Sequence, residues 1–221
     1  MMSKSSEQMI DYLNQVVSQL YQQGQYAQGL DLAFQVRETA NQELGEGHPQ
    51  YAMALNNLGL LYQATGNFTD AEPLLHQALE IRRKSLGEHD PYFAQSLNNL
   101  AELYRQRGNY NTAEPLYKQA LAIRRRAWGD NHPGVATILN NLGLLYQAAG
   151  NYTAAEPLLL QALPIMRDAE GEDSLAFAQG LNNLGVLYRS MHNYSKAESL
   201  YRQALEIRLA KLGETNPLVA T

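Results

Sequence analysis

The feature that most constrains the fold of this chain is an internal repeat of constant length. A box of two asparagines and a leucine begins at Asn56 and returns at Asn98, Asn140 and Asn182, each time 42 residues further along. Columns of tyrosine, alanine and glycine keep the same register without insertion or deletion. A unit of this size cannot bury its own apolar face, so the fixed period predicts a stack of copies that share one continuous core.

The repeat divides residues 1–221 into a single array. We predict a degenerate first repeat, four regular repeats and the start of a sixth, with boundaries at 8–49, 50–91, 92–133, 134–175, 176–217 and 218–221. The first copy is the weakest and has Asn14 in the place of Asn56, as is usual where one face of a terminal repeat meets water. Residues 217–221 match 133–137, so we expect this chain to be part of a longer array.

Each repeat carries the pattern of two helices. In the second repeat, apolar residues over 52–62 follow helical spacing, and Gly66 ends this first helix, helix A. Residues 69–72, Thr-Asp-Ala-Glu, have the form of a capping box, so we expect the second helix, helix B, to begin at Thr69. The residue expected to end helix B is a glycine in every repeat: Gly45, Gly87, Gly129, Gly171 and Gly213.

Prolines and small residues refine this arrangement. Pro73, Pro115 and Pro157 are expected in the first turn of helix B, where a missing N–H is tolerated, whereas Pro164 is expected to kink the fourth helix B. Small residues in the Gly59 column let another helix approach closely. The predicted fold class is all-α: a right-handed α-solenoid of antiparallel helix pairs with one concave face.

Composition and charge restrict the function. The chain has 17 Lys and Arg against 22 Asp and Glu, a net charge of −5, which disfavours nucleic-acid binding because that affinity depends on neutralising phosphates. No run of about 18 apolar residues predicts a membrane span. Residues 1–8 are polar and lack the apolar stretch of a signal peptide, so we expect a cytoplasmic protein that does not enter a membrane.

Catalytic and metal-binding patterns do not emerge from the sequence. There is no cysteine, and His48, His89 and His132 stand alone in linkers without a partner at metal-ligand spacing. No phosphate-binding loop, nucleophile elbow or carboxylate pair is recognisable. The repeated glutamates of the Glu72 column are explained by capping, and the tyrosines of the Tyr62 column by core packing. We therefore expect neither an enzyme nor a bound cofactor or metal.

The residues resemble a known family. The positions that carry the resemblance to the tetratricopeptide repeat signature are Leu55, Leu58, Gly59, Tyr62, Ala71, Leu75 and Ala78. The usual period is about 34 residues, and the longer period here, the Leu-Asn-Asn-Leu box and the Gly-Glu/Asp-x-x-Pro linker are similar to kinesin light chain-type repeats. The resemblance extends from about Asn14 to Thr221. Repeats this alike, rich in Gln and Asn, look more like a bacterial relative than a kinesin subunit.

The resemblance implies a peptide-binding role for the inner face of the helices A. There the asparagines of the box pair with the backbone of an extended or short helical ligand, since a side-chain amide offers both a donor and an acceptor. Adjacent residues on a helix point about 100° apart, so we expect the two asparagine columns to serve different surfaces. The family pattern favours the second column for the ligand: Asn57, Asn99, Asn141 and Asn183. The other column is then expected to brace neighbouring helices.

Further groove residues are predicted one turn away on the same face. Gln95, Gln179 and Glu102 occupy these positions, together with the Leu60 column. Arg105 and Arg189 fall at the edge, where they either hold acidic ligand residues or face solvent. Basic runs at 82–84 and 124–126 lie at the C-terminal ends of two helices B. There they either complement the helix dipole or form a rim that recruits acidic peptides.

The sequence thus predicts a scaffold that holds a peptide segment of a partner protein. Two alternatives remain open. The chain is a self-assembling solenoid if the bare face of the last helix B, residues 197–212, stacks end to end on another copy. It is a sensor or interaction arm if it belongs to a larger signalling protein.

Overall fold

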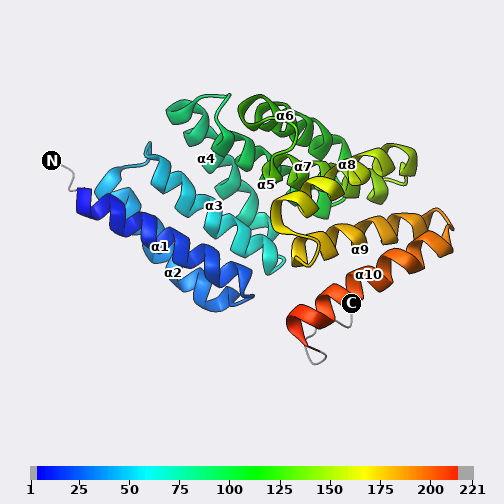
Figure 1. Cartoon of the computed structure of the whole chain (residues 1–221). Coiled ribbons are helices and arrows are strands. Elements are labelled where there is room, and N and C mark those ends of the chain that lie inside the picture. The colour runs from blue at the N-terminus through cyan, green and yellow to red at the C-terminus, as the bar shows by residue number, and fades with distance from the viewer. Residues whose placement is uncertain (1–3, 214–221) are drawn as a thin grey trace. The chain divides into compact units, whose positions relative to one another are not determined.

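The computed structural model describes residues 4–213, which form a tandem series of α-helices joined by short turns (Figure 1). The predicted alternation of helix A and helix B is confirmed, with helices A carrying odd numbers. The helices are α1 (Lys4–Gln22), α2 (Tyr26–Leu44), α3 (Pro49–Ala64), α4 (Phe68–Leu86), α5 (Pro91–Gln106), α6 (Tyr110–Trp128), α7 (Pro133–Ala148), α8 (Tyr152–Glu170), α9 (Leu175–Ser190) and α10 (Tyr194–Leu212). The predicted start of a sixth repeat, 218–221, lies outside the described residues.

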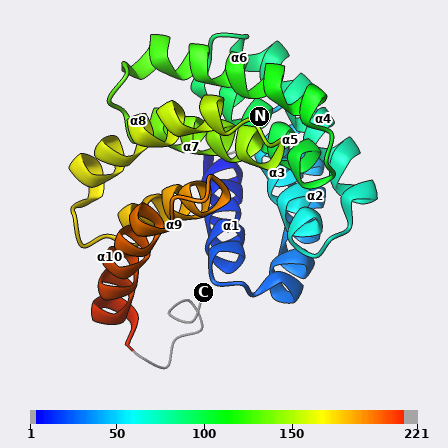
Figure 2. The same ribbon diagram turned by 90° about the vertical axis from the view of Figure 1, so that its right-hand side faces the viewer.

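The chain consists of two compact units, residues 1–123 and 124–221. In the first unit α1 contacts α3 and α3 contacts α5, so the helices A form one layer. Helix B of a repeat packs between two helices A, because α4 contacts both α3 and α5. The second unit repeats this arrangement with α8 against α7 and α9, and Figure 2 shows α9 and α10 side by side as an antiparallel pair.

Leucine and alanine columns build the core of each unit. In the first unit Leu55 and Leu58 of α3 are buried against Val36 of α2. The predicted close approach at the glycine column is confirmed, because a Cβ atom added to Gly59 would lie 2.8 Å from Cγ of Leu75. Only a residue without a side chain fits at this crossing of α3 and α4 in its present geometry.

Helix B begins earlier than the capping box predicted. Asn67 is the N-cap of α4, and its side-chain oxygen accepts a hydrogen bond from the backbone N–H of Asp70 at 3.4 Å. Asn151 and Asn193 cap α8 and α10 in the same way. The prediction of a cap at Thr69 was wrong, because the positive φ of Gly66 (79°) already reverses the chain and places an asparagine, which is a strong N-cap, at the helix start.

The shifted start moves the prolines into the helices. Pro73 lies inside α4 rather than in its first turn, and Pro157 lies inside α8. α8 continues through Pro164 as far as Glu170, and the kink expected at Pro164 stays a prediction.

The linkers supply caps for the helices A. His48 and His132 accept hydrogen bonds through Nδ1 from the backbone N–H groups two residues on, at 3.2 and 3.0 Å. Asp90 and Ser174 cap α5 and α9 from the same position of the repeat. The linker histidines therefore have a structural role that the sequence analysis missed, although a cap-forming residue before a helix-starting proline was a visible signal.

Replacing each of the two capping candidates by alanine tests the corrected helix start. Asn67→Ala should lower the free energy of unfolding by about 1 kcal/mol, because the first turn of α4 loses its side-chain acceptor. Thr69→Ala should change it by less than about 0.5 kcal/mol. Urea denaturation followed by circular dichroism measures both, and a larger loss for Thr69→Ala than for Asn67→Ala would restore the capping-box assignment.

Candidate functional site

Within each unit, a ladder of asparagine side chains connects successive helices A. The Nδ2 group of Asn99 donates to Oδ1 of Asn56 at 2.9 Å, and that of Asn183 donates to Oδ1 of Asn140 at 2.8 Å. Asn57 donates to both the backbone and the side-chain oxygen of Asn14, at 3.1 and 3.3 Å. The second asparagine of each of these boxes therefore bonds to the first position of the box before it.

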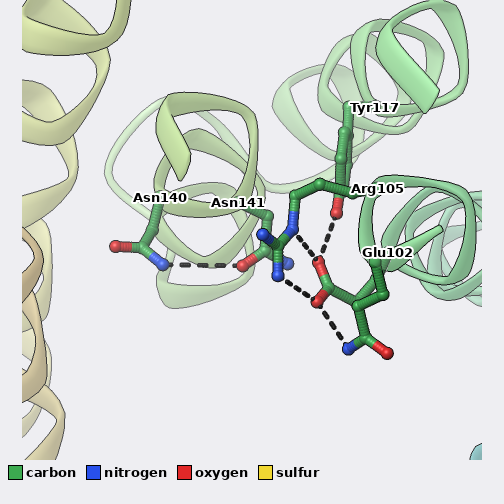
Figure 3. Close-up of polar contacts among 6 residues, drawn as sticks. Glu102, Arg105, Tyr117, Asn140 and Asn141 are labelled. Carbon is green, nitrogen blue, oxygen red and sulfur yellow. Dashed lines mark hydrogen bonds and ion pairs between the residues drawn. The ribbon is translucent and has the colours of Figure 1, made fainter. Parts of the chain in front are cut away.

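The two asparagine columns meet at one interface, contrary to expectation. Within one box, Asn98 donates to Oδ1 of its neighbour Asn99 at 3.4 Å, and Asn140 donates to Asn141 at 3.5 Å, as Figure 3 shows for the second pair. The expected separation of the two columns did not hold, because adjacent asparagines are within hydrogen-bond reach of each other, although in the second repeat Asn57 bonds to α1 and Asn56 to α5. The ladder thus gives the second column a bracing role, and its contact with a ligand stays a prediction.

A cleft opens on the helix A layer of the first unit. Its volume is about 200 Å³, and α1, α3 and α5 all contribute to it. It is lined by Val17, Ser18, Tyr21, Gln22, Asn56, Asn57, Leu60 and Gln95. The structure therefore brings together two of the predicted site residues, Asn57 and Gln95, and adds the α1 residues that the weak first repeat concealed.

Glu102 and Arg105 form a closed network instead of two free charges. Arg105 donates to both carboxylate oxygens of Glu102, at 2.8 and 2.6 Å, and the Tyr117 hydroxyl donates at 2.7 Å (Figure 3). Burial by itself would raise the pKa of Glu102, but hydrogen bonds from Arg105, Tyr117 and Gln106 outweigh burial and lower it. Glu102 is therefore ionised at neutral pH, and Arg105 is engaged by a residue of its own helix.

The predicted residues of the second unit have different surroundings. Gln179 is exposed and uses both ends of its amide, donating to Asn183 at 2.8 Å and accepting from Arg208 at 3.1 Å. Arg189 is also exposed, and it lines a hollow of about 350 Å³ on the outer side of α10, beside Tyr194 and Ala197. Gln179 and Arg189 therefore do not share one cleft with each other as Asn57 and Gln95 do.

Arg82 is a buried cation that the sequence analysis placed in a surface run. Only 2% of its surface is exposed, and its Nη1 donates to the Tyr92 carbonyl, the Ser96 hydroxyl and Oε1 of Gln95, at 3.1, 2.9 and 3.4 Å. Burial lowers the pKa of Arg82 to about 10, so the guanidinium is still charged at neutral pH. Arg82 therefore joins α4 to α5, and it cannot take part in a basic rim.

Two of the repeated glutamates, Glu72 and Glu156, bond to tyrosines of the next helix A. Glu72 accepts a hydrogen bond from the Tyr104 hydroxyl at 2.8 Å and pairs with Arg107, and Glu156 accepts one from Tyr188 at 2.8 Å. Burial and the hydrogen bond to Glu72 raise the pKa of Tyr104 to about 12. The attribution of these glutamates to capping was wrong, because the helices B begin further upstream and leave the carboxylates free to reach the following repeat.

Over 4–213, no helix is both long enough and apolar enough to cross a membrane. Within the same range, no three His, Asp or Glu side chains gather closely enough to hold a metal ion.

Helix pairs in tandem, a constant period and an interlocking amide ladder define a helical-repeat protein. The sequence matches the tetratricopeptide repeat family over residues 8–84, 51–126, 92–168 and 134–210, and the chain belongs to this family. A search of curated proteins gives no match. Proteins of this family are typically non-enzymatic scaffolds that bind protein or peptide partners.

Solved structures of kinesin light chain-like proteins share the fold. BtubC (BKLC) from P. vanneervenii is 27% identical and superposes with a TM-score of 0.76 over 96% of this chain and 85% of its own. A kinesin light chain-like protein of P. anserina with nearly identical TPR-like repeats is 24% identical, with a TM-score of 0.72 over 95% and 98% of the two chains. A Rap protein complexed with Competence and Sporulation Factor is 17% identical, with a TM-score of 0.78 over 90% and 54%. The all-α solenoid of helix pairs is thereby confirmed.

A double-mutant cycle tests the ladder. Asn56→Ala and Asn99→Ala remove the two ends of one hydrogen bond, so their effects on the free energy of unfolding should be non-additive by about 1 kcal/mol. Asn56→Ala and Asn183→Ala, which lie in different units, should be additive within about 0.5 kcal/mol. Additivity of the first pair, measured by urea denaturation, would show that the ladder does not couple the repeats.

Proposed function

We propose that this protein is a scaffold that holds a peptide segment of a partner protein on the helix A face. The observation that carries the proposal is the cleft of the first unit, where side chains of three successive helices A surround about 200 Å³. Its lining consists of amides, hydroxyls and aliphatic groups. Such groups suit hydrogen bonding to a peptide backbone and burial of a side chain. The cleft is smaller than the roughly 300–1,000 Å³ of pockets for drug-sized molecules.

The relatives support a binding role. The tetratricopeptide match covers nearly the whole chain, and the Rap protein of similar fold binds Competence and Sporulation Factor. We extend the role to the predicted groove column, Asn57, Asn99, Asn141 and Asn183, and to Gln95, Gln179, Glu102, Arg105 and Arg189 at its borders. Each hydrogen bond contributes about 1 kcal/mol net, so the roughly 8 kcal/mol of micromolar affinity also requires apolar contacts.

The asparagines act in this proposal in two ways. Asn57 lines the cleft directly, but its amide already bonds to Asn14. Asn99 holds the oxygen of Asn56 and so fixes the direction in which the Asn56 amide points. Alanine at these positions would therefore disturb both the ligand face and the packing of the helices A, and a test of binding needs substitutions elsewhere in the cleft.

A second candidate function is self-assembly, and the outer face of α10 favours it. Tyr194 is 63% exposed and Leu205 is 41% exposed on this face, which carries the hollow of about 350 Å³. On α8 the matching surface is buried against α9, where Ala155 and Leu159 join the core of the second unit. A head-to-tail contact with a second copy would bury the α10 face, and repetition of such a contact would give an open chain of molecules.

Filling the cleft tests the peptide-binding proposal. The parent protein should enrich a motif from a random peptide library, and Leu60→Trp should weaken the selected peptide at least tenfold, because the indole occupies the space for a ligand side chain. The control is Leu160→Trp, since Leu160 is exposed on α8, outside the cleft. Equal binding by Leu60→Trp and the parent, with both folded by circular dichroism, would remove the cleft as the site.

Sedimentation equilibrium tests the assembly candidate. The mass of the parent protein should rise with concentration, and Leu205→Glu should abolish the rise because a charge in the apolar contact opposes stacking. Leu160→Glu is the matched control, because Leu160 has a similar exposed fraction, 45%, on another helix B. A concentration-independent mass of 24.7 kDa for the parent would exclude self-assembly through this face.

A further inference from the structure

The cleft of the first unit has a defined hydrogen-bond polarity. Oδ1 of Asn56 accepts from Asn99 at 2.9 Å, and this contact turns the Nδ2 group of Asn56 the other way. Oε1 of Gln95 accepts from the buried Arg82 at 3.4 Å, which fixes the Gln95 amide in the same manner. Neither Nδ2 of Asn56 nor Nε2 of Gln95 has a hydrogen-bond partner within residues 4–213. Two amide donors of the cleft are therefore left without a protein acceptor, beside hydroxyls and the Gln22 amide, which can both donate and accept.

The same cleft contains no carboxylate, guanidinium or ammonium group among its lining residues. Arg82 lies behind Gln95 and is almost fully buried, and Arg105 is bound by Glu102. The exposed arginine of the first basic run, Arg83, pairs with Glu80 at 2.8 Å and approaches Glu88 at 3.6 Å. An acidic ligand would thus find no unpaired cation in the cleft and would lose part of its hydration on entering it.

Apolar surface completes the wall. Leu60 is half-buried and Tyr21 is 36% exposed, whereas Val17 has no exposed surface, so the first two supply the apolar wall. A ligand that satisfies both features presents carbonyl oxygens to the amides and one apolar side chain to this wall. Peptide backbone supplies neutral carbonyl acceptors at every residue.

We propose that the cleft selects an uncharged peptide segment, whose backbone carbonyls accept hydrogen bonds from Asn56 and Gln95 and whose apolar side chain packs against Tyr21 and Leu60. This inference rests on the peptide-binding function proposed above and sharpens it, because it replaces the acidic ligand that the sequence left open by a neutral one. The chain of bonds from Arg82 through Gln95 also polarises the ligand-facing N–H and strengthens its donation.

Two matched peptide libraries with blocked termini test the selectivity. They are identical except that every Gln and Asn of the neutral library is Glu or Asp in the acidic one. The parent protein should enrich neutral peptides, and their affinity should change less than threefold between about 50 and 500 mM NaCl, because no ion pair is screened. Enrichment of acidic peptides with a steep loss in salt would overturn the inference while leaving peptide binding intact. Binding of neither library would overturn both proposals.

Substitutions at Gln95 test the donor. Gln95→Glu keeps the oxygen that Arg82 binds and removes the N–H donor, and Gln95→Met removes the donor without adding charge. Each should weaken the selected neutral peptide about fivefold or more. Gln161→Glu is the control, because Gln161 is exposed on α8 outside the cleft and also accepts from an arginine, Arg125, at 3.1 Å. Unchanged affinity in both Gln95 variants, folded as judged by circular dichroism, would refute the assignment.

Discussion

The arrangement of the helices A depends on one constraint: the second asparagine of a box finds its hydrogen-bond partner on the preceding helix A, as Asn57, Asn99 and Asn183 do. Asn57 is only 8% exposed, and its amide is satisfied by Asn14 in the repeat before it. An unpaired amide at such a position costs about 1–3 kcal/mol, so a slip of one helix A along its neighbour is penalised at several rungs together. A residue inserted in a helix A before its asparagines would turn them by about 100° away from this partner, which favours helices A of constant length.

The ladder also determines which polar atoms reach the cleft. When the Oδ1 atom of an asparagine accepts a hydrogen bond from the next repeat, its Nδ2 group points away from that contact. Asn56, which accepts from Asn99, is the example. Gln95 reaches the same state through a different partner, the buried Arg82. The hydrogen bonds that amide oxygens accept from neighbouring repeats therefore hold the helices together. They also leave the amide N–H groups of Asn56 and Gln95 available to ligand groups that accept hydrogen bonds.

The sequence predicted the helix pairs and their glycine ends because these depend on local patterns with a strict period. It failed at one local choice between caps and wherever a residue acts across repeats. Thr69 has the form of an N-cap, but Asn67 takes that position once Gly66 has reversed the chain. Glu72 was assigned to that cap and bonds instead to Tyr104 of the following helix A. The burial of Arg82 was equally out of reach, because its acceptors belong to the next helix.

Departures from the repeat consensus carry the information about a ligand. The Leu60 column has Glu102 in the third repeat, where Tyr117 and Arg105 surround its carboxylate. A charge that is neutralised inside its own repeat preserves the fold and removes an apolar patch from the helix A face at that point. The apolar wall of the first-unit cleft is thus confined to α1 and α3. On α5 the lining residue is Gln95, which offers a side-chain N–H donor. Identical repeats would bind any backbone alike, so a preferred register of the peptide has to come from such local differences.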